Sequence, residues 1–388
     1  MIWRKAGLAL YLCIALAPAA TGGLQAAEVE LLRTPSDGIQ PQAAVDGKGA
    51  VHVVYLSGDP LAADIYYVRL EGKAFSKPVR VNSQPGSAIA AGIVRGAHIA
   101  VGREGRIHVA WMGSKSAGPR GPNGATPMLY ARLNDTRTAF EPQRNVMQSA
   151  DGLDGGGSIA ADRAGNVYVA WHGHGGGQGE ENRRVWVARS QNDGRTFGRE
   201  TAANPNPTGA CACCGMRAFT AGDGAGPAAL YALYRGAQEG FNRDMHLLAS
   251  RDAGKTWHSR LVHPWKRNAC PMSTATFSQA DGRLLAAWET EGQVYYAPVS
   301  GGGDAVQPIA APGGTARRKH PAVAVNAAGR TLLAWVETGG WKQPGSLSWQ
   351  VFDEAGKPAA ASGRDVPVPV WGLATAVARP DGRFLIVH

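Results

Sequence analysis

The chain has 388 residues, of which 44% are hydrophobic and 18% charged, with a formal net charge of +10 at pH 7. Lysine and arginine are scattered, and their only tight cluster is the segment 317–319, so the sequence has no basic stripe of the kind that nucleic-acid binding requires. A chain of this length usually forms two or three domains, unless a repeat accounts for it as one body.

The first 26 residues have the pattern of a secretory signal. Arg4 and Lys5 precede an apolar run over 6–17, and small residues follow up to Ala26. This order is typical of a cleaved export signal, and the run is shorter than the ~18 residues of a membrane span. We therefore expect a periplasmic or secreted protein that does not span the membrane. Residues 27–388 are expected to form one domain and to act as a monomer.

One pattern recurs along the rest of the chain: a small-residue strand, a Gly-containing turn, and an alternating apolar strand that usually ends in an aromatic residue. Seven such units end at Tyr55, Trp111, Trp171, Tyr234, Trp288, Trp335 and Val387. Their spacing is close to the roughly 40–50 residues of a four-stranded propeller blade with its loops. The Gly turns supply the positive φ of tight hairpins.

Further short strands complete these units. Third strands are expected at 64–70, 128–133, 184–190, 245–251, 294–299 and 347–352. Fourth strands are expected at 78–82, 199–204, 259–263 and 366–370. The last unit stops after its second strand, and the N-terminal segment 28–35 is expected to serve as its missing fourth strand. The sequence thus predicts an all-β, seven-bladed propeller closed by the N-terminal strand, or a six-bladed one if one unit is a decoration.

Two hairpins carry a sharper motif. Residues 250–257, "SRDAGKTW", match Ser-x-Asp-x-Gly-x-Thr-Trp throughout, and residues 190–197, "SQNDGRTF", match with Asn192 and Phe197 as replacements. On these Asp boxes the chain resembles the sialidase-type (BNR-repeat) propellers. The motif is specific for the fold, since its Asp accepts turn N–H groups and its Gly takes positive φ. The resemblance implies that these turns face away from the active site.

The resemblance also implies what an active site would need: three arginines for a carboxylate, a Tyr nucleophile with a Glu, and an Asp acid/base. The family's first arginine stands in an aromatic-Arg-Ile-Pro element, and here "LRTP" keeps only Arg33 and Pro35. Arg217, Arg235 and Arg243 are candidates for gripping a carboxylate, and no Tyr/Glu pair is identified. An exo-glycosidase acting on an anionic sugar is therefore one possible function, and whether the chain is an enzyme stays open.

The cysteines fall in two connections between blades. Cys211, Cys213 and Cys214 precede the first strand of the fourth blade, and Cys270 precedes that of the fifth. In a propeller these connections share a face with the loops between second and third strands. We therefore expect one cluster at this face. It would combine the cysteines with Met216, Met272, His172, His174, Arg235, Arg243, Asp244 and Glu289.

Three interpretations of the cysteines remain open. Two disulfides are the simplest in an oxidising compartment, and their connectivity cannot be derived from sequence. A soft-metal site, with copper favoured, fits thiolate and thioether ligands together with imidazole. A labile Cys213–Cys214 disulfide would give a redox role. The leading hypothesis is a propeller that binds a ligand or a soft metal at this face. The alternatives are a sialidase-like glycosidase and a scaffold for a protein partner.

Overall fold

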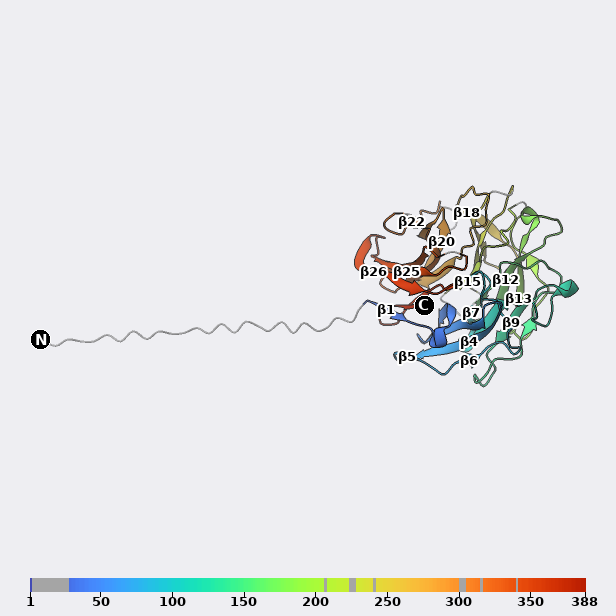
Figure 1. Cartoon of the computed structure of the whole chain (residues 1–388), viewed down its shortest axis with the longest axis horizontal. Coiled ribbons are helices and arrows are strands. Elements are labelled where there is room, and N and C mark those ends of the chain that lie inside the picture. Colours follow the sequence, from blue (N-terminus) through green and yellow to red (C-terminus); the bar gives the residue numbers. More distant parts are fainter. Residues whose placement is uncertain are drawn as a thin grey trace.

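The computed structural model describes Met1 and residues 28–205, 208–222, 228–239, 242–299, 305–314, 317–339 and 341–388. Residues 2–27 lie outside the described part, and the signal assigned to residues 1–26 falls almost entirely there. The described residues form seven sheets, six of them antiparallel and the seventh mixed, arranged as the blades of a propeller (Figure 1). The prediction of a seven-bladed all-β propeller is therefore confirmed.

The first three blades follow the chain in order. Blade 1 consists of β2 (Ile39–Val45), β3 (Val51–Asp59), β4 (Ala62–Glu71), β5 (Ala74–Phe75) and β6 (Val79–Arg80). Blade 2 consists of β7 (His98–Val101), β8 (Ile107–Met112), β9 (Met128–Arg132) and β10 (Arg144–Asn145). Blade 3 consists of β11 (Gly157–Ala161), β12 (Val167–Gly173), β13 (Arg184–Ser190) and β14 (Thr201–Ala202).

The next three blades repeat this arrangement. Blade 4 consists of β15 (Arg217–Ala221), β16 (Ala229–Arg235), β17 (Met245–Ser250) and β18 (His258–His263). Blade 5 consists of β19 (Thr276–Ala280), β20 (Arg283–Thr290), β21 (Gln293–Pro298) and β22 (Ile309–Ala310). Blade 6 consists of β23 (Lys319–Val325), β24 (Thr331–Glu337), β25 (Gly345–Phe352) and β26 (Pro358–Val368). Short 3-10 turns are η1 (Pro35–Asp37), η2 (Arg103–Gly105), η3 (Pro122–Gly124) and η4 (Glu180–Asn182).

The seventh blade joins the two ends of the chain. It contains β27 (Thr375–Ala378), β28 (Phe384–Val387) and the N-terminal strand β1 (Val29–Leu32). β1 pairs with β28 in parallel, so the N-terminal strand takes the third place in this blade rather than the expected fourth. In this sheet β27 covers one edge of β28, and β1 covers the other.

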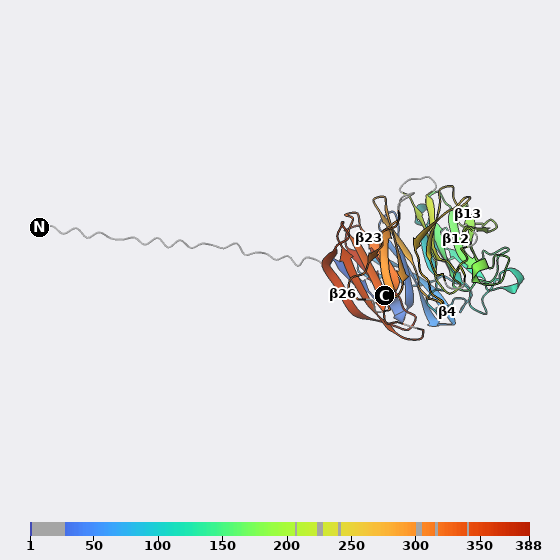
Figure 2. The same cartoon turned by 90° about the horizontal axis from the view of Figure 1, so that it is seen from above.

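The first strands of the blades line the centre of the ring. Successive first strands contact one another in the order β2, β7, β11, β15, β19, β23, β27 and back to β2, so the seven blades close into a ring, which Figure 2 shows turned by 90°. Between the blades lie the predicted packing residues. Trp111, Trp171 and Trp288 are fully buried, and Trp335 is buried against the neighbouring sheet. No helix in the described part is long and apolar enough to cross a membrane.

The Asp boxes lie where the sequence predicts them, in the turns that follow the third strands of blades 3 and 4. In the complete box, Gly254 has a φ of 83°. Its N–H donates to the Ser250 hydroxyl at 2.8 Å, and Asp252 accepts the N–H groups of Lys255 and Thr256. The turn is therefore closed by its own side chains, as a structural motif should be.

Candidate functional site: a sulfur cluster at the mouth

The long connections of blades 3, 4 and 5 meet on the face opposite the Asp-box turns. We call this face the mouth, and define it by residues 174–183, 208–216, 242–244, 264–275 and 291–292. The two cysteine-bearing connections are joined there by a disulfide between Cys213 and Cys270, whose Cα atoms are 6.1 Å apart. The prediction that Cys270 reaches the cysteines of the preceding connection is confirmed.

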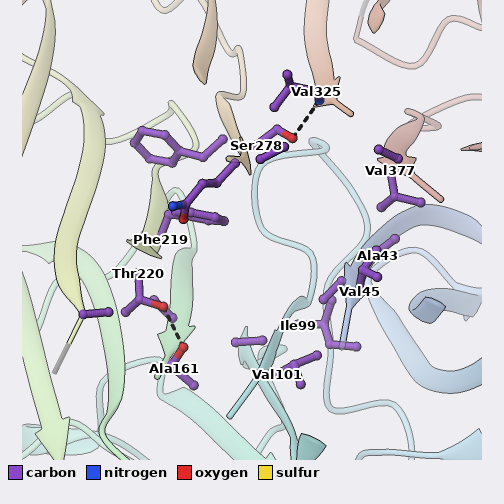
Figure 3. A pocket seen from close by; sticks show the side chains of 18 of the residues that line it. Ala43, Val45, Ile99, Val101, Ala161, Phe219, Thr220, Ser278, Val325 and Val377 are labelled. Carbon is purple, nitrogen blue, oxygen red and sulfur yellow. Dashed lines mark hydrogen bonds between the residues drawn. The ribbon is translucent and has the colours of Figure 1, made fainter. Parts of the chain in front are cut away.

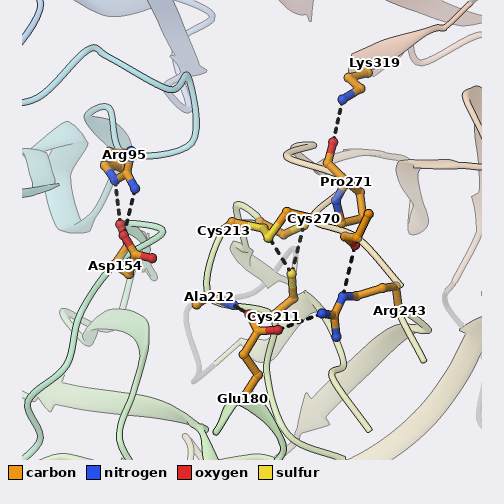
Figure 4. The surroundings of a disulfide bond; sticks show 12 residues. Arg95, Asp154, Glu180, Cys211, Ala212, Cys213, Arg243, Cys270, Pro271 and Lys319 are labelled. Carbon is orange, nitrogen blue, oxygen red and sulfur yellow. Dashed lines mark hydrogen bonds and ion pairs between the residues drawn. A yellow bond between two sulfur atoms is a disulfide. The ribbon is translucent and has the colours of Figure 1, made fainter. Parts of the chain in front are cut away.

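The other two cysteines of this region, Cys211 and Cys214, are free and buried. The Cys211 sulfur lies 3.5 Å from the Cys213 sulfur and 3.4 Å from the Cys214 sulfur. We call Cys211, Cys213, Cys214 and Cys270 the sulfur cluster. Figure 4 shows the Cys211 side chain directed toward the disulfide. The hypothesis of a Cys213–Cys214 bridge is wrong, because Cys213 is bonded to Cys270, and the second bridge of the two-disulfide hypothesis is not formed.

Three sulfurs of the cluster form a triangle. The Sγ atoms of Cys211, Cys213 and Cys270 all lie within 4.8 Å of one another. If Cys211 stood in line with the disulfide, its sulfur would be about 5.5 Å from that of Cys270, given a bond of ~2.05 Å. The observed triangle excludes this linear arrangement in the present conformation.

The polypeptide around the cluster is fixed by hydrogen bonds from two blades. The Cys211 N–H donates to the Arg235 carbonyl at 2.8 Å, at the end of β16. The Ala212 N–H donates to Glu180 Oε1 at 2.7 Å, which ties the connection to the loop of blade 3. The Gly215 N–H donates to the Ser273 carbonyl at 3.0 Å, beside the Cys270 connection. The cluster is therefore held on a backbone that three connections share.

Arg243 forms an ion pair below the cluster. Its Nη2 lies 2.7 Å from Glu180 Oε2, and its side chain is buried. Asp244, the next residue, instead accepts the Trp265 N–H at 2.7 Å and so fixes the connection that leads to Cys270. Arg243 is thus already paired within the protein, and Asp244 has a role in shaping the loop.

Arg235 forms a second, buried ion pair. Its Nη1 donates to the Arg243 carbonyl at 2.6 Å, and its Nη2 lies 3.9 Å from Glu289 Oε2. The guanidinium also stacks 4.8 Å from the centre of the Trp265 ring. Burial raises the pKa of Glu289, against the effect of Arg235. Arg235 is therefore engaged by internal groups and is not presented to a ligand.

Two further cations lie beside the cluster without a carboxylate partner among the described residues. Lys319 Nζ donates to the Pro271 carbonyl at 2.5 Å, and burial lowers the pKa of Lys319. Arg183 is buried, and its Nη2 lies 3.2 Å from His172 Nδ1. Lys319 interacts electrostatically with Cys214, and Arg183 interacts with Cys211.

The Cys211 thiol donates a hydrogen bond to the Cys214 sulfur. This hydrogen bond and the charge of Arg235 lower the pKa of Cys214, although burial acts in the opposite direction. The same hydrogen bond, together with burial, raises the pKa of Cys211.

The histidines and methionines that the sequence predicted for the cluster lie at different depths and in different places. His172 is buried, its Nε2 has no hydrogen-bond partner, and burial lowers its pKa to about 3. His174 is exposed and pairs with Asp151 at 2.9 Å. Met216 packs in the core between blades 3 and 4, whereas Met272 lines a small cleft beside Lys319. The sulfur cluster therefore gathers the cysteines but not the thioethers.

Arg217 lies in the centre of the ring and not with Arg235 and Arg243. From the first position of β15 its Nη1 donates to Gln42 Oε1 at 2.7 Å and contacts His98 Nδ1 at 2.9 Å, so it reaches across to blades 1 and 2. Burial lowers the pKa of Arg217 to about 10, and its buried Nε has no acceptor. It borders a central cavity of about 470 Å³, walled by residues such as Ile99, Phe219 and Val325 (Figure 3). Arg33 is exposed on the seventh blade.

Sequence reasoning missed Glu180, Lys319, Arg183 and Trp265, which pair with or pack around the residues it did choose. The only available signal was position. Glu180 and Arg183 stand in the same mouth loop as the predicted histidines. Glu180 pairs with Arg243 of blade 4, and Arg183 contacts His172 across its own loop, so no spacing in the sequence could have identified these contacts.

Comparison with known proteins supports the fold. No family model and no curated protein matches the sequence. Among solved structures, a fungal alcohol oxidase of the AA5 family in complex with copper aligns over 89% of this chain and 69% of its own, at 14% identity and a TM-score of 0.51. A Hadza microbial sialidase aligns over 82% and 69% at 16% identity and a TM-score of 0.48. An ulvan lyase aligns over 90% of both chains at 14% identity and a TM-score of 0.48. At these identities the likeness concerns the propeller alone.

Proposed function

We propose that the protein binds a soft monovalent metal ion, Cu(I), at the sulfur cluster. Cys211 and Cys214 are the constant ligands, and Cys213 and Cys270 join them when their disulfide is reduced. The observation that carries the proposal is the triangle of three sulfurs within 4.8 Å of one another, with the fourth sulfur 3.4 Å from Cys211. Soft thiolate ligands select Cu(I) among the common metals.

The shape of the cluster favours metal binding over rapid exchange between its own sulfurs. Thiol–disulfide exchange requires the attacking sulfur to approach one sulfur of the bond as the other leaves. In the triangle described above, the Cys211 sulfur does not lie in line with the Cys213–Cys270 bond. Once the disulfide is reduced, the four neighbouring sulfurs can instead be arranged around one bound ion.

The surrounding charges favour a monovalent ion. Among the buried cations near the cluster, Arg243 pairs with Glu180 and Arg235 with Glu289. Lys319 and Arg183 remain without a carboxylate in the described part of the chain, and they stabilise thiolate sulfur. The same positive charge repels a divalent ion twice as strongly as a monovalent one.

Competition for Cu(I) tests the proposal. The mature protein, reduced and handled without oxygen, is titrated against the Cu(I) chelator bathocuproine disulfonate. We expect the wild type to hold Cu(I), and Cys211→Ser to weaken that affinity by more than about 100-fold, because Cys211 contacts two other sulfurs. The matched control is Ser149→Ala, which replaces a hydroxyl on a connection that carries no cysteine. Equal affinity in Cys211→Ser and the wild type would refute the proposal.

A second candidate function rests on Arg217, whose guanidinium has no carboxylate partner among the described residues. Such a cation at a central cavity suits the carboxylate of an anionic sugar, which guanidinium binds with two parallel hydrogen bonds. Calorimetry with N-acetylneuraminic acid tests this, and Arg217→Gln is expected to weaken binding by about tenfold or more. Arg33→Gln, at an exposed position, is the control. No heat of binding in the wild type would exclude this candidate.

The proposal includes export, because residues 1–26 have the pattern of a secretory signal. Export places the Cys213–Cys270 disulfide in an oxidising compartment, where such bonds persist. Fractionation of cells that express the full chain is expected to find the shortened protein outside the cytoplasm. Full-length protein confined to the cytoplasm would contradict export without affecting the metal site.

A further inference from the structure

The four sulfurs differ in their access to solvent. Cys270 is exposed and Cys213 is half-buried, while Cys211 and Cys214 are buried. A dissolved metal complex therefore meets Cys270 first. Cysteine reactivity follows exposure and thiolate character, so the disulfide pair and the buried pair have different chemical roles.

The buried pair lies directly behind the exposed one. Cys211 is 3.5 Å from Cys213 and 3.4 Å from Cys214, so a metal ion released at Cys213 has two thiols within one step. Arg183 interacts electrostatically with Cys211 on this side of the cluster, while Lys319 lies against Pro271, next to Cys270. Their charge favours entry of an ion that has already lost one positive charge.

We infer that the dithiol form of Cys213 and Cys270 reduces Cu(II) and delivers the Cu(I) product to Cys211 and Cys214. Two Cu(II) ions each accept one electron. The two thiols lose two protons and form the Cys213–Cys270 bond, so the products are two Cu(I) ions, one disulfide and two protons. One Cu(I) ion is held by Cys211 and Cys214, and the other leaves. The inference rests on the proposed Cu(I) site, and adds to it the divalent substrate and the order in which the cysteines act.

In this scheme the structure corresponds to the oxidised product, with the exposed pair bridged and the buried pair free. A new cycle requires an external dithiol that reduces the bridge by thiol–disulfide exchange at the exposed Cys270. The buried pair is shielded from the same reagent by its position. The arrangement thus separates electron supply at the surface from metal retention inside.

Anaerobic addition of Cu(II) sulfate to the fully reduced, reductant-free protein tests the inference. Loss of the Cu(II) paramagnetic signal, thiol counting and peptide mapping are followed together. We expect two Cu(II) ions to be reduced per chain, two thiols to disappear, and the new disulfide to join Cys213 and Cys270. A Cys211–Cys214 disulfide as the main product, or persistence of the Cu(II) signal, would overturn the inference.

Two matched variants separate this activity from metal binding. Cys270→Ser removes the exposed thiol, and should slow Cu(II) reduction by at least roughly tenfold, while Cys211 and Cys214, the constant ligands, still bind added Cu(I). Cys211→Ser should still reduce Cu(II), but release Cu(I) to the chelator. An unchanged reduction rate in Cys270→Ser would refute the electron-supplying pair and leave the Cu(I) site standing. Reduction in the wild type without retention of Cu(I) would refute the proposed site instead.

Discussion

The Asp-box turn of blade 4 and the mouth differ in how their polar groups are satisfied. In the turn, Asp252 accepts hydrogen bonds from Ser250, Lys255 and Thr256, and these hold the pKa of Asp252 well below its usual value. At and just beside the mouth, several buried polar atoms have no hydrogen-bond partner among the described residues. They are His172 Nε2, Arg183 Nε, Arg243 Nη1 and Glu289 Oε2.

This difference sets the mouth apart from the turn, although unsatisfied buried atoms also occur inside the blades, as at Trp171 Nε1 and Thr331 Oγ1. An unsatisfied buried polar group costs roughly 1–3 kcal/mol, so a fold keeps few of them without a reason. The hydrogen bonds of the turn come from its own residues, although the buried Nε1 of Trp257 at its end has no hydrogen-bond partner. The mouth retains its unsatisfied groups around the sulfur cluster, which is the place where a bound ion or a water would complete them.

The largest expected effect on stability comes from breaking a buried pair at the mouth. Arg235→Ala leaves Glu289 buried without its cation and two carbonyl groups without their donor. We expect the free energy of unfolding to fall by about 3–5 kcal/mol. Arg267→Ala is the matched control, since Arg267 lies over the same Trp265 ring but is exposed. Urea denaturation of both variants measures the difference, and equal losses would contradict the account.

An intermediate effect is expected from acid. Burial, with the charge of Lys319, lowers the pKa of His320 from 6.5 to about 3 in the folded protein. Between these values the unfolded chain binds the proton and the folded one does not, so the free energy of unfolding falls as the pH falls through this range. From pH 7 to pH 5 the loss due to His320 is about 2 kcal/mol. His320→Gln should remove that part of the pH dependence; an unchanged slope in urea denaturation would show that His320 does not cause it.

The smallest effect is expected at the Asp-box turn. Ser250→Ala removes the acceptor of the Gly254 N–H and one donor to Asp252. The free energy of unfolding should fall by about 1–2 kcal/mol, because both bonds are local and the turn can recruit water. Cu(I) affinity should stay at the wild-type value, since the turn lies on the opposite face. A loss of affinity in Ser250→Ala would mean that the two faces are not independent.

Most of the fold could be predicted from the sequence because its repeat is local. Each blade carries its own Gly turn, its alternating strand and its terminal aromatic residue, so the number of blades and their order follow from counting. The pairing of Cys213 with the Cys270 connection could also be predicted in part, since adjacent blades bring their connections to one face. The position of β1 as the third strand of blade 7 could not be predicted, because this position depends on which edge of the last sheet stays open.

The contents of the site were harder to predict, since neighbours there come from different blades. Met216 follows Cys214 closely in sequence, yet its side chain packs into the core as β15 begins. Arg217 stands next to it and borders the central cavity, where its Nη1 contacts Gln42 and His98 and not Arg235 or Arg243. The partners of these two arginines, Glu180 and Glu289, depend on loop conformations that no periodicity in the sequence encodes.

The central claim is that sulfur atoms of the mouth bind Cu(I). X-ray absorption at the copper edge of the reduced, Cu(I)-loaded protein measures the neighbours of the metal directly. The account predicts sulfur neighbours alone, and fewer of them in Cys211→Ser. A copper site surrounded by nitrogen and oxygen, unchanged in that variant, would contradict it.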